Sequence, residues 1–445
     1  MLKPFARAVL CLTMSWIAVG ACLLCSPRIA AADGLISAAS RLDEVYDSAR
    51  GIVYVTNGSQ IVRYQVSTGT YLAPISLTGT LAGIDISPDD NTLAVADETL
   101  NLSGYPMIYL IDLPTLAATP VQFPENDNEG GSFSVAFTDS GNVLVSTNYQ
   151  GSGWVPLRLY NPNIQTTTVV ASITQESMLC ASADRSSIGV AESNISDGRF
   201  GRYRVADGNW QEQTGYTLGT SWFNYEIGVN STATLYAIPT YGGTFFYDTD
   251  LLKTGPTVGV AGGEQPIGVV FSPNSDIVYF PWEGTSTVYA YNTSTYTSVA
   301  AYNFGSAFTM NGNRAYDNGR MKISKDGSLL FASVAGGVQF VTVGASTLRL
   351  DSLSQSSAPA GNPDVSITVI GNAFDSSALV EWNGNSLPTT VTSSTELEAT
   401  IPAADLATSE ASVVSVTDGA NSSNPLRFYV TPAAPIALAA IASTN

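Results

Sequence analysis

The sequence predicts an all-β chain in which a ring of repeated four-stranded units precedes a small β-sandwich. A polar turn recurs between residues 46 and 327, with an apolar strand-like run on each side of it. After Val343 this repeat stops, and a shorter series of alternating strands follows. The chain also contains 39 Gly and 22 Pro for turns, with 21 Tyr, 16 Phe and 6 Trp to fill large cores. Together these features indicate folded β domains rather than disorder.

The repeated turn gives the architecture of the first part. Its clearest copies are Ser87-Pro88-Asp89, Ser272-Pro273-Asn274 and Ser324-Lys325-Asp326, residues that form tight turns at low cost. With the looser copies, turns begin at residues 46, 87, 138, 182, 228, 272 and 324, a mean spacing of about 46 residues. Four short strands in each copy are typical of a propeller blade, so seven copies predict a seven-bladed β-propeller. Leu35 to Ser40 is expected to supply the missing outer strand of the last blade and close the ring.

A motif within the first repeat points to a family. Tyr54-Val55-Thr56-Asn57 spells YVTN, and the Ser-Pro-Asp turns accompany it. On these residues, the segment 33–346 resembles the YVTN-type seven-bladed propellers of bacteria and archaea. The motif belongs to an inner strand and implies no chemistry. Relatives with this fold include cell-surface proteins, periplasmic binding proteins and sugar-lactone hydrolases, so the fold alone does not choose a function.

Short alternating strands with Gly, Pro and Asn turns fill residues 347–431 and predict a small β-sandwich. A Pro-x-Gly start, a Gly-Asn-x-Phe turn, a Trp-Asn-Gly hairpin and an Ala-Thr-Ile-Pro strand follow one another in that order. The segment resembles the IPT/TIG family of Ig-like domains, which implies a spacer or a protein-interaction module. Residues 432–445 form an apolar tail that is too short to span a membrane.

Residues 1–32 are expected to be a secretory signal peptide. Lys3 and Arg7 precede an apolar run that ends at Cys25, and Ala30-Ala31-Ala32 forms a small-residue cleavage pattern. The alternatives are an uncleaved membrane anchor and a lipoprotein acylated at Cys22. We therefore expect an exported protein that is periplasmic, on the cell surface or extracellular, with no integral membrane span in the mature chain.

Charge and composition exclude several function classes. The chain has 18 Lys and Arg against 37 Asp and Glu and contains no histidine. Catalytic triads that use histidine and metal sites ligated by histidine are therefore impossible within it. Its net charge of −19 argues against nucleic acid and anionic lipid as partners. Removal of residues 1–32 leaves Cys180 as the single cysteine, which is expected to be a small buried hydrophobe.

The candidate site lies in the loops of the propeller. By analogy with the fold, the ligand face is built from loops between the second and third strands and from loops between blades. Aromatic rings beside carboxylates in these loops can bind a glycan or a protein, or can simply pack the loops together. The candidate ligand-binding residues are Asp97, Tyr149, Trp154, Glu192, Trp222, Tyr241, Trp282, Glu283 and Arg320.

One acidic loop is a candidate calcium site. Glu125, Asp127 and Glu129 offer the oxygen ligands that calcium prefers, although their spacing misses the EF-hand pattern. A solvated acidic loop is the alternative, and no other cofactor is expected.

We expect a monomeric, exported, non-catalytic binding or adhesion-type protein. Its partner would be a protein or glycan of the cell envelope or the extracellular space. The alternative is a lactonase-like propeller hydrolase that acts on a sugar or lactone. This alternative is weaker because the resemblance to lactonases implies a histidine in the central funnel, which this chain lacks.

Overall fold

The prediction of an all-β chain is confirmed. The structure is a computed structural model that describes residues 29–30, 34–124, 126–192, 198–213, 224–259, 265–308, 320–343, 348–372, 374–393, 395–418, 422–423 and 425–433. The elements of these residues are strands, and none of the residues lies in a helix. In this part of the chain, no helix has the length and apolar character needed to cross a membrane. Most of the predicted signal peptide lies outside it.

Five sheets in the first part of the chain each contain four consecutive antiparallel strands. The first sheet contains β3 (Arg41–Asp47), β4 (Ile52–Asn57), β5 (Gln60–Gln65) and β6 (Thr70–Ser76), and the second contains β7 (Leu81–Ile86), β8 (Thr92–Asp97), β9 (Met107–Asp112) and β10 (Ala117–Gln122). The third contains β11 (Glu129–Phe137), β12 (Val143–Tyr149), β13 (Trp154–Asn161) and β14 (Thr166–Thr174), and the fourth contains β15 (Ser177–Ala181), β16 (Ser187–Glu192), β17 (Phe200–Arg204) and β18 (Asn209–Glu212). The fifth contains β19 (Gly228–Val229), β20 (Tyr236–Thr240), β21 (Gly243–Tyr247) and β22 (Lys253–Val258).

Two more sheets complete this part of the described chain, and each includes a strand from near the N-terminus. The sixth sheet contains β23 (Val270–Phe271), β24 (Ile277–Pro281), β25 (Thr287–Asn292) and β26 (Ser298–Asn303), with β1 (Ile29–Ala30) added in parallel to β26. The seventh contains β27 (Met321–Ile323), β28 (Leu329–Val334), β29 (Gly337–Thr342) and β2 (Gly34–Ser37).

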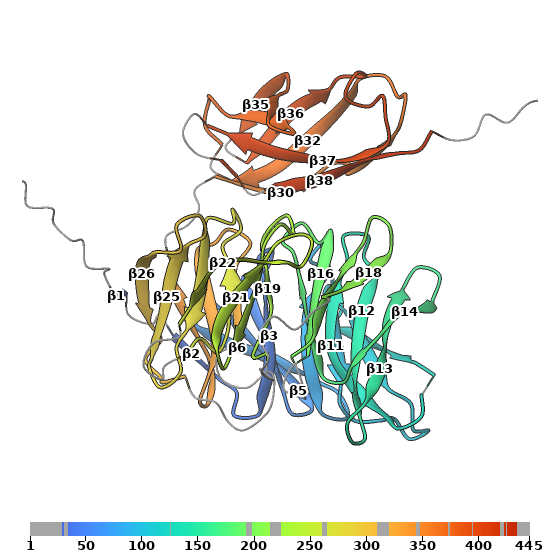
Figure 1. Cartoon of the computed structure of the whole chain (residues 1–445), viewed down its shortest axis with the longest axis vertical. Helices are drawn as coiled ribbons and strands as arrows, with labels where there is room; N and C mark the ends of the chain where they lie inside the picture. Colours follow the sequence, from blue (N-terminus) through green and yellow to red (C-terminus); the bar gives the residue numbers. More distant parts are fainter. Residues whose placement is uncertain are drawn as a thin grey trace, which may run out of the picture.

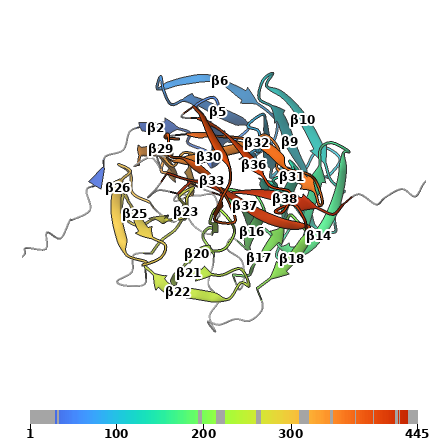
Figure 2. The same ribbon diagram turned by 90° about the horizontal axis from the view of Figure 1, so that it is seen from above.

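The strand predicted from residues 35–40 closes the ring. β2 pairs antiparallel with β29, from Gly34 opposite Phe340 to Ser37 opposite Gly337. The two ends of this part of the chain therefore meet in one sheet. Figure 2 shows the sheets arranged around a common centre, with the outer strands β6, β10, β14, β18 and β22 at the rim. The pairing completes the seventh sheet with a fourth strand, and the chain then continues from β2 directly into β3 of the first sheet.

The core consists of layers between neighbouring sheets. One cluster joins the second and third sheets through Ala94, Ile108, Val135 and Val145, and others join the remaining neighbours. Burial falls from the centre outward: all nine residues of β11 are buried, whereas β14 is largely exposed. The inner strands are therefore buried on both sides, with some polar side chains such as Asp43 and Glu44 among the buried residues, whereas outer strands such as β14 are exposed.

The seven described turns between the first and second strands differ in length but share one backbone feature. Each contains a residue with a left-handed backbone, with φ between 52° and 77°, at Gly51, Asp90, Gly141, Arg185, Ala233, Ser275 and Gly327. Five of the turns, which begin at Ser87, Ser182, Asn230, Ser272 and Ser324, are closed by the same bond, from the N–H of the first residue to the carbonyl five residues later. Four of these turns use the same hydroxyl. It donates to a carboxylate or amide oxygen two residues later and accepts the N–H five residues later, at Ser87, Ser182, Ser272 and Ser324. The Ser-x-Asp or Ser-x-Asn pattern is thus a self-bonded turn.

These turns define two faces. The turn face comprises residues 48–51, 87–91, 138–142, 182–186, 230–235, 272–276 and 324–328, which join first to second strands. The opposite face, here the loop face, comprises the connections from second to third strands and from each sheet to the next. The predicted ligand-binding loops belong to the loop face.

The YVTN motif lies in β4, the second strand of its sheet. Thr56 is fully buried, and its hydroxyl accepts the N–H of Asp43 and lies 2.8 Å from the carbonyl of Ala82 in the next sheet. Asn57 accepts the N–H of Ser40 through its side-chain oxygen at 2.7 Å. The motif therefore joins the first two sheets, in agreement with a structural rather than a chemical role.

Charged side chains on the turn face join sheets that are not immediate neighbours in the ring. Arg185 reaches from the fourth sheet to Asp85 of the second, with 2.7 Å between Nη1 and Oδ2, and also donates to the carbonyls of Phe137 and Ile86. Lys325 of the seventh sheet pairs with Asp90 of the second at 2.6 Å. Burial alone would raise the pKa of Asp85, but Arg185 and its hydrogen bonds hold that pKa below its ordinary value.

The C-terminal part contains two further sheets. One has the order β30 (Arg349–Leu353), β32 (Val365–Asn372), β36 (Glu396–Ile401), β35 (Thr389–Ser393). The other has the order β31 (Ser357–Pro359), β38 (Leu426–Thr431), β37 (Glu410–Thr417), β33 (Leu379–Trp382), β34 (Asn385–Ser386).

Both C-terminal sheets contribute to one core of their own. Trp382 packs against Phe428 there, with 5.3 Å between the ring centroids, and Val369 and Leu397 of the other sheet belong to the same core.

The C-terminal sheets lie over the turn face (Figure 1). Arg427 Nε lies 3.2 Å from Asp184 Oδ2, and Arg427 Nη2 donates to the carbonyl of Thr232. The Tyr429 hydroxyl donates to Asp139 Oδ2 at 2.6 Å. Two residues of β38 thus contact three neighbouring turns, while the loop face is at the opposite end of the sheets.

Removal of both side-chain contacts should release the C-terminal sheets from the turn face. Asp184 has a fully buried side chain, and a hydrogen bond to a charged group contributes about 1.5–3 kcal/mol. We expect the double variant Arg427→Ala, Tyr429→Phe to show a larger radius of gyration in X-ray scattering, with both cores still folded by circular dichroism. Scattering curves that superpose on those of the parent would show that other contacts hold the two parts together.

Candidate functional site

Three clusters of side chains on or near the loop face contain six of the predicted site residues. The first lies between the third and fourth sheets, the second between the fifth and sixth, and the third around the central axis. Trp222 and Glu125 lie outside the described residues.

The first cluster contains Trp154 and Glu192. The Trp154 side chain is 55% exposed, and the guanidinium of Arg199 lies 5.4 Å from its ring centroid. The backbone N–H of Arg199 donates to Glu192 Oε2 at 3.3 Å, and Glu192 is buried. An exposed indole with a cation over its ring is therefore held at the loop-face end of the third and fourth sheets.

The Tyr149 ring packs against the loop that precedes Trp154. A Cβ atom on Gly153 would be 2.8 Å from the Tyr149 ring, so only glycine allows the ring to lie against this loop. Asn128 donates to the Tyr149 hydroxyl at 3.4 Å. Tyr149 thus packs the loop that carries Trp154, and a direct role in binding is not needed to explain it.

The second cluster contains Tyr241, Trp282 and Glu283. Gln265 Nε2 donates to Glu283 Oε2 at 2.7 Å and to the Tyr225 hydroxyl at 3.2 Å. Burial, followed by the charge of Glu283 and the neighbouring Tyr241, raises the pKa of Tyr225 to about 12. Tyr241 itself is 65% exposed. Carboxylate, amide and phenol groups therefore meet beside an exposed ring.

Trp282 contributes packing contacts to this cluster. Its ring meets Tyr289 edge to face, with 5.7 Å between the centroids, and a bridge pairs its backbone with Pro266. Its Nε1–H is buried with no hydrogen-bond partner among the described residues. Trp282 is therefore mainly a packing residue with one unsatisfied donor.

The third cluster surrounds the central axis and contains Arg320. Its Nε lies 3.2 Å from Glu226 Oε1 and 3.3 Å from Asp43 Oδ1, and Lys322 Nζ lies 3.5 Å from the same oxygen of Asp43. Arg320, Asp43 and Glu226 are at most 4% exposed, whereas the Lys322 side chain is 27% exposed. The cluster ties the first, fifth and seventh sheets together. Burial raises the pKa of Glu226 to about 7, and Arg320 opposes that shift.

Three consecutive residues connect the clusters. Asn224 donates to the carbonyl of Arg199 at 3.2 Å, Tyr225 contacts Gln265, and Glu226 pairs with Arg320. The segment 224–226 therefore reaches all three clusters from the start of the fifth sheet. The site residues predicted from the sequence do not include Asn224, Tyr225, Glu226, Arg199 or Gln265. Their partners lie on other sheets, and no local pattern signals such contacts.

Asp97 lies apart from these clusters. Its Oδ1 accepts the backbone N–H groups of Thr80 and Thr99 at 2.9 Å each, and it is 2% exposed. Burial raises its pKa against these hydrogen bonds. Asp97 therefore fixes the connection between the first and second sheets.

Glu129, one of the calcium candidates, forms an internal ion pair. Both of its carboxylate oxygens contact the Arg158 guanidinium, and Oε1 also accepts the Thr147 hydroxyl. Its oxygens are thus already engaged by the fold, and it is fully buried. No group of three or more Cys, Asp or Glu residues in the described part of the chain is arranged to hold a metal ion.

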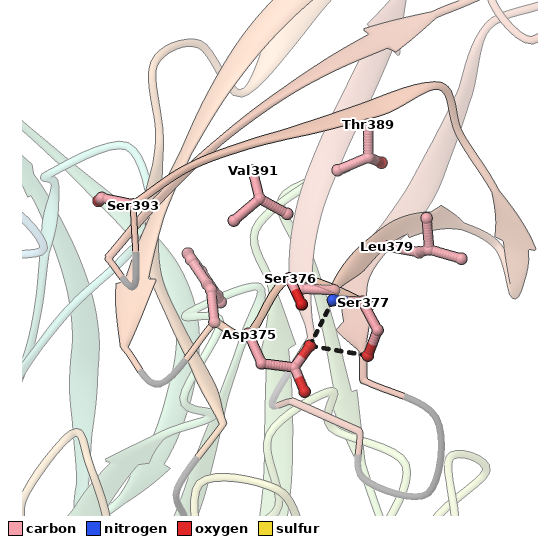
Figure 3. Close-up of a pocket in the computed structure, with 9 residues that line it drawn as sticks. Asp375, Ser376, Ser377, Leu379, Thr389, Val391 and Ser393 are labelled. Carbon is pink, nitrogen blue, oxygen red and sulfur yellow. Dashed lines mark hydrogen bonds between the residues drawn. The ribbon is translucent and has the colours of Figure 1, made fainter.

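A cavity of about 580 Å³ lies in the C-terminal part, away from all three clusters (Figure 3). Asp375 and Ser377 line it with Thr389, Val391 and Ser393. The Asp375 carboxylate accepts both the N–H and the hydroxyl of Ser377, and these bonds lower its pKa. Its carboxylate is bonded within its own turn, so we place the candidate site on the loop face.

Comparison with known proteins supports the fold. No family model and no curated protein matches the sequence. Among solved structures, the β-propeller domain of Cps50 (Swd1) from Myceliophteria thermophila is similar with a TM-score of 0.52 and 10% identity, covering 70% of this chain and 99% of that one. Hydrazine synthase from Kuenenia stuttgartiensis is similar with the same score and identity, covering 70% and 98%. The likeness shows that the first part of the chain has a β-propeller fold.

Removal of Arg320 should destabilise the ring. The change to alanine leaves Asp43 and Glu226 buried without this cation, and loss of one partner of a buried ion pair costs about 3–5 kcal/mol. Urea unfolding measures this loss. Arg204→Ala is the control, because Arg204 pairs with Asp207 at the surface, where about 1 kcal/mol or less is expected. Equal losses in the two variants would contradict a structural role for the axial cluster.

Glu44, beside the axial cluster, should make stability depend on pH. Burial and then Asp43 raise its pKa to about 8, above its ordinary value of 4.5. The folded state therefore holds a proton that the unfolded state loses between these values, so the unfolding free energy falls as pH rises from about 5 to 8. The Glu44→Gln variant should show a flatter profile in this range. The control variant Glu398→Gln changes an exposed side chain and should keep the parent's dependence of the unfolding free energy on pH. If Glu44→Gln also keeps that dependence, the raised pKa is not that of Glu44.

Proposed function

We propose that the seven sheets form a seven-bladed propeller of the YVTN type and that residues 347–431 form an Ig-like domain of the IPT/TIG type. The left-handed residue in each of the seven described turns supports the first assignment. The single core shared by the two C-terminal sheets supports the second. On this proposal the boundaries are 1–32 for the signal peptide, 33–346 for the propeller, 347–431 for the Ig-like domain and 432–445 for the tail.

We infer that the protein is an exported, non-catalytic binding or adhesion-type protein that recognises a protein or glycan through its loop face. The observation that carries this proposal is the contrast between the two faces. Arg427 and Tyr429 join the C-terminal sheets to the turn face. The loop face carries exposed aromatic side chains in three loops, at Tyr105, Trp154 and Tyr241. Exposed aromatic residues on a rigid scaffold are typical of recognition surfaces.

The Ig-like domain has a more specific role in this proposal than that of a flexible spacer. Its contacts with three turns orient the loop face away from the C-terminal part of the chain. A signal peptide or a lipid at Cys22 would deliver the protein to the envelope, and the recognition face would be free for a partner.

Burial of the titratable groups supports binding over hydrolysis. The acids whose pKa values are raised towards neutrality, Glu44 and Glu226, are 0% and 3% exposed. A general acid or base must reach the substrate within hydrogen-bond distance. These acids are enclosed by the inner strands, so their raised pKa values reflect structural burial.

Alanine substitutions of the exposed rings should abolish recognition without unfolding the protein. The double variant Trp154→Ala, Tyr241→Ala should lose capture of the partner in a pulldown from envelope proteins and on a glycan array, with an unchanged melting temperature. The matched control is Ile164→Ala, which removes a side chain 67% exposed in the β13–β14 turn. Undiminished capture by the double variant would overturn the assignment of the loop face. Turnover of a lactone or sugar substrate would favour the hydrolase.

A further inference from the structure

We propose that the loop face binds an extended, uncharged glycan, with Tyr241 and Trp154 as stacking platforms and the Gln265–Glu283 pair as the group that binds sugar hydroxyls. This inference rests on the proposed binding function and specifies its ligand class.

The Gln265–Glu283 pair presents acceptors in a fixed arrangement. The backbone N–H of Glu283 donates to the carbonyl of Gln265 at 2.9 Å, and the side chains are joined at 2.7 Å. The Gln265 amide nitrogen uses its two hydrogens for Glu283 and Tyr225, which fixes the orientation of the amide.

This arrangement selects the chemistry of the ligand. The remaining oxygens, Oε1 of Gln265 and Oε1 of Glu283, accept no hydrogen bond from the described residues. Two acceptors on side chains that are bonded to each other suit a ligand that donates more than one hydrogen bond, as the hydroxyls of a sugar do. A carboxylate acceptor also forms shorter and stronger hydrogen bonds than a neutral one.

Tyr241 provides an apolar surface beside these acceptors. The N–H of Tyr225 donates to the carbonyl of Pro239 at 2.9 Å, two residues before Tyr241, and Tyr241 is 65% exposed. Thr240 and Gly243, the ends of the turn that carries it, belong to paired strands, and the Thr240 hydroxyl donates to the carbonyl of Gly243 at 2.9 Å. A ring on so short a turn loses little conformational freedom when a ligand stacks on it. An aromatic surface beside paired acceptors matches a pyranose, which has apolar C–H groups on one face and hydroxyls around its edge.

Trp154 is a second aromatic surface on a different sheet from Tyr241, and it extends the proposed site beyond the Gln265–Glu283 pair. One face of its ring is covered by the Arg199 guanidinium, yet the side chain remains 55% exposed. Asn224 bonds the backbone of Arg199, and the next residue, Tyr225, contacts Gln265. The two platforms are thus connected through adjacent residues of one segment, so a ligand that uses both must contain several sugar units.

The charge of the site favours an uncharged ligand. The Glu283 carboxylate would repel a uronic acid or a phosphorylated sugar at the acceptor pair, and the net charge of −19 adds to the repulsion of polyanions. A peptide fits less well, because its backbone offers N–H donors singly rather than in adjacent pairs.

The test measures binding of three probes to the full chain by calorimetry: a neutral glucose hexamer, an N-acetylglucosamine hexamer and a galacturonic acid hexamer. We expect one or both neutral hexamers to bind and the acidic hexamer to fail. Tyr241→Ala and Trp154→Ala should each weaken binding about tenfold, and a dimer of the neutral sugar should bind much more weakly than the hexamer. Glu283→Gln should reduce the discrimination against the acidic hexamer, whereas Ile164→Ala should change none of these values.

The outcomes separate the ligand class from the binding function. If no neutral hexamer binds while a captured envelope protein is lost in Trp154→Ala, Tyr241→Ala, the glycan inference is wrong and the binding function stands. If a neutral hexamer binds equally well to the parent and to these variants, the site is misplaced. If the acidic hexamer binds more tightly than the neutral ones, the selectivity assigned to Glu283 is wrong.

Discussion

The pairing of β2 with β29 is the interaction on which the architecture depends. It joins residues as distant as Gly34 and Gln339, which are 305 positions apart, and completes the seventh sheet with a strand from the other end of the fold. Closure of so long a loop costs conformational entropy, and the cost grows only slowly with length. This cost is offset because, in the closed ring, each sheet packs against two neighbours. The axial contacts of Arg320 with Asp43 and Glu226 tie three sheets of the same ring together from inside.

The closed ring also has two faces that differ in structure, the turn face and the loop face. The turn face is regular, because each of its described turns is short and contains one left-handed residue. β38 contacts three neighbouring turns there with only two side chains. The loop face has no such uniformity, since its connections differ in length and composition. The turn face therefore carries the contact with the C-terminal sheets, and the proposed recognition is assigned to the loop face.

Much of the fold could be predicted from sequence because its determinants are local. The serine hydroxyl at Ser87 or Ser272 bonds groups within five residues, so its pattern is visible in the sequence at each copy. The closing strand was also predictable, since the seventh repeat lacked one. The site was predicted less well. Trp154, Tyr241 and Glu283 were named from residue type and loop position, but the contacts of Arg199 with Trp154 and of Tyr225 with Gln265 each join two different sheets.

Burial, which the sequence does not show, separates the remaining candidates by role. Arg320 belongs to a buried ion cluster, Asp97 accepts backbone N–H groups, and Glu129 pairs with Arg158. A charged residue in a predicted loop can be a ligand-binding group or a structural anchor, and only its neighbours in space decide between them. The same limit applies to β38, because nothing in the residues around Arg427 and Tyr429 signals contact with turns some 200 to 300 positions earlier.

Hydrogen exchange with bound partner tests the division between the two faces most directly. The amides of the full chain would be followed by mass spectrometry with and without the glycan or protein that it captures. The account predicts slower exchange in the loop-face segments 98–106, 150–153 and 282–286, with no change in the turn segments 138–142, 182–186 and 230–235. Protection confined to those turns, together with faster exchange in β38, would contradict it, because the partner would then displace the C-terminal sheets from the turn face.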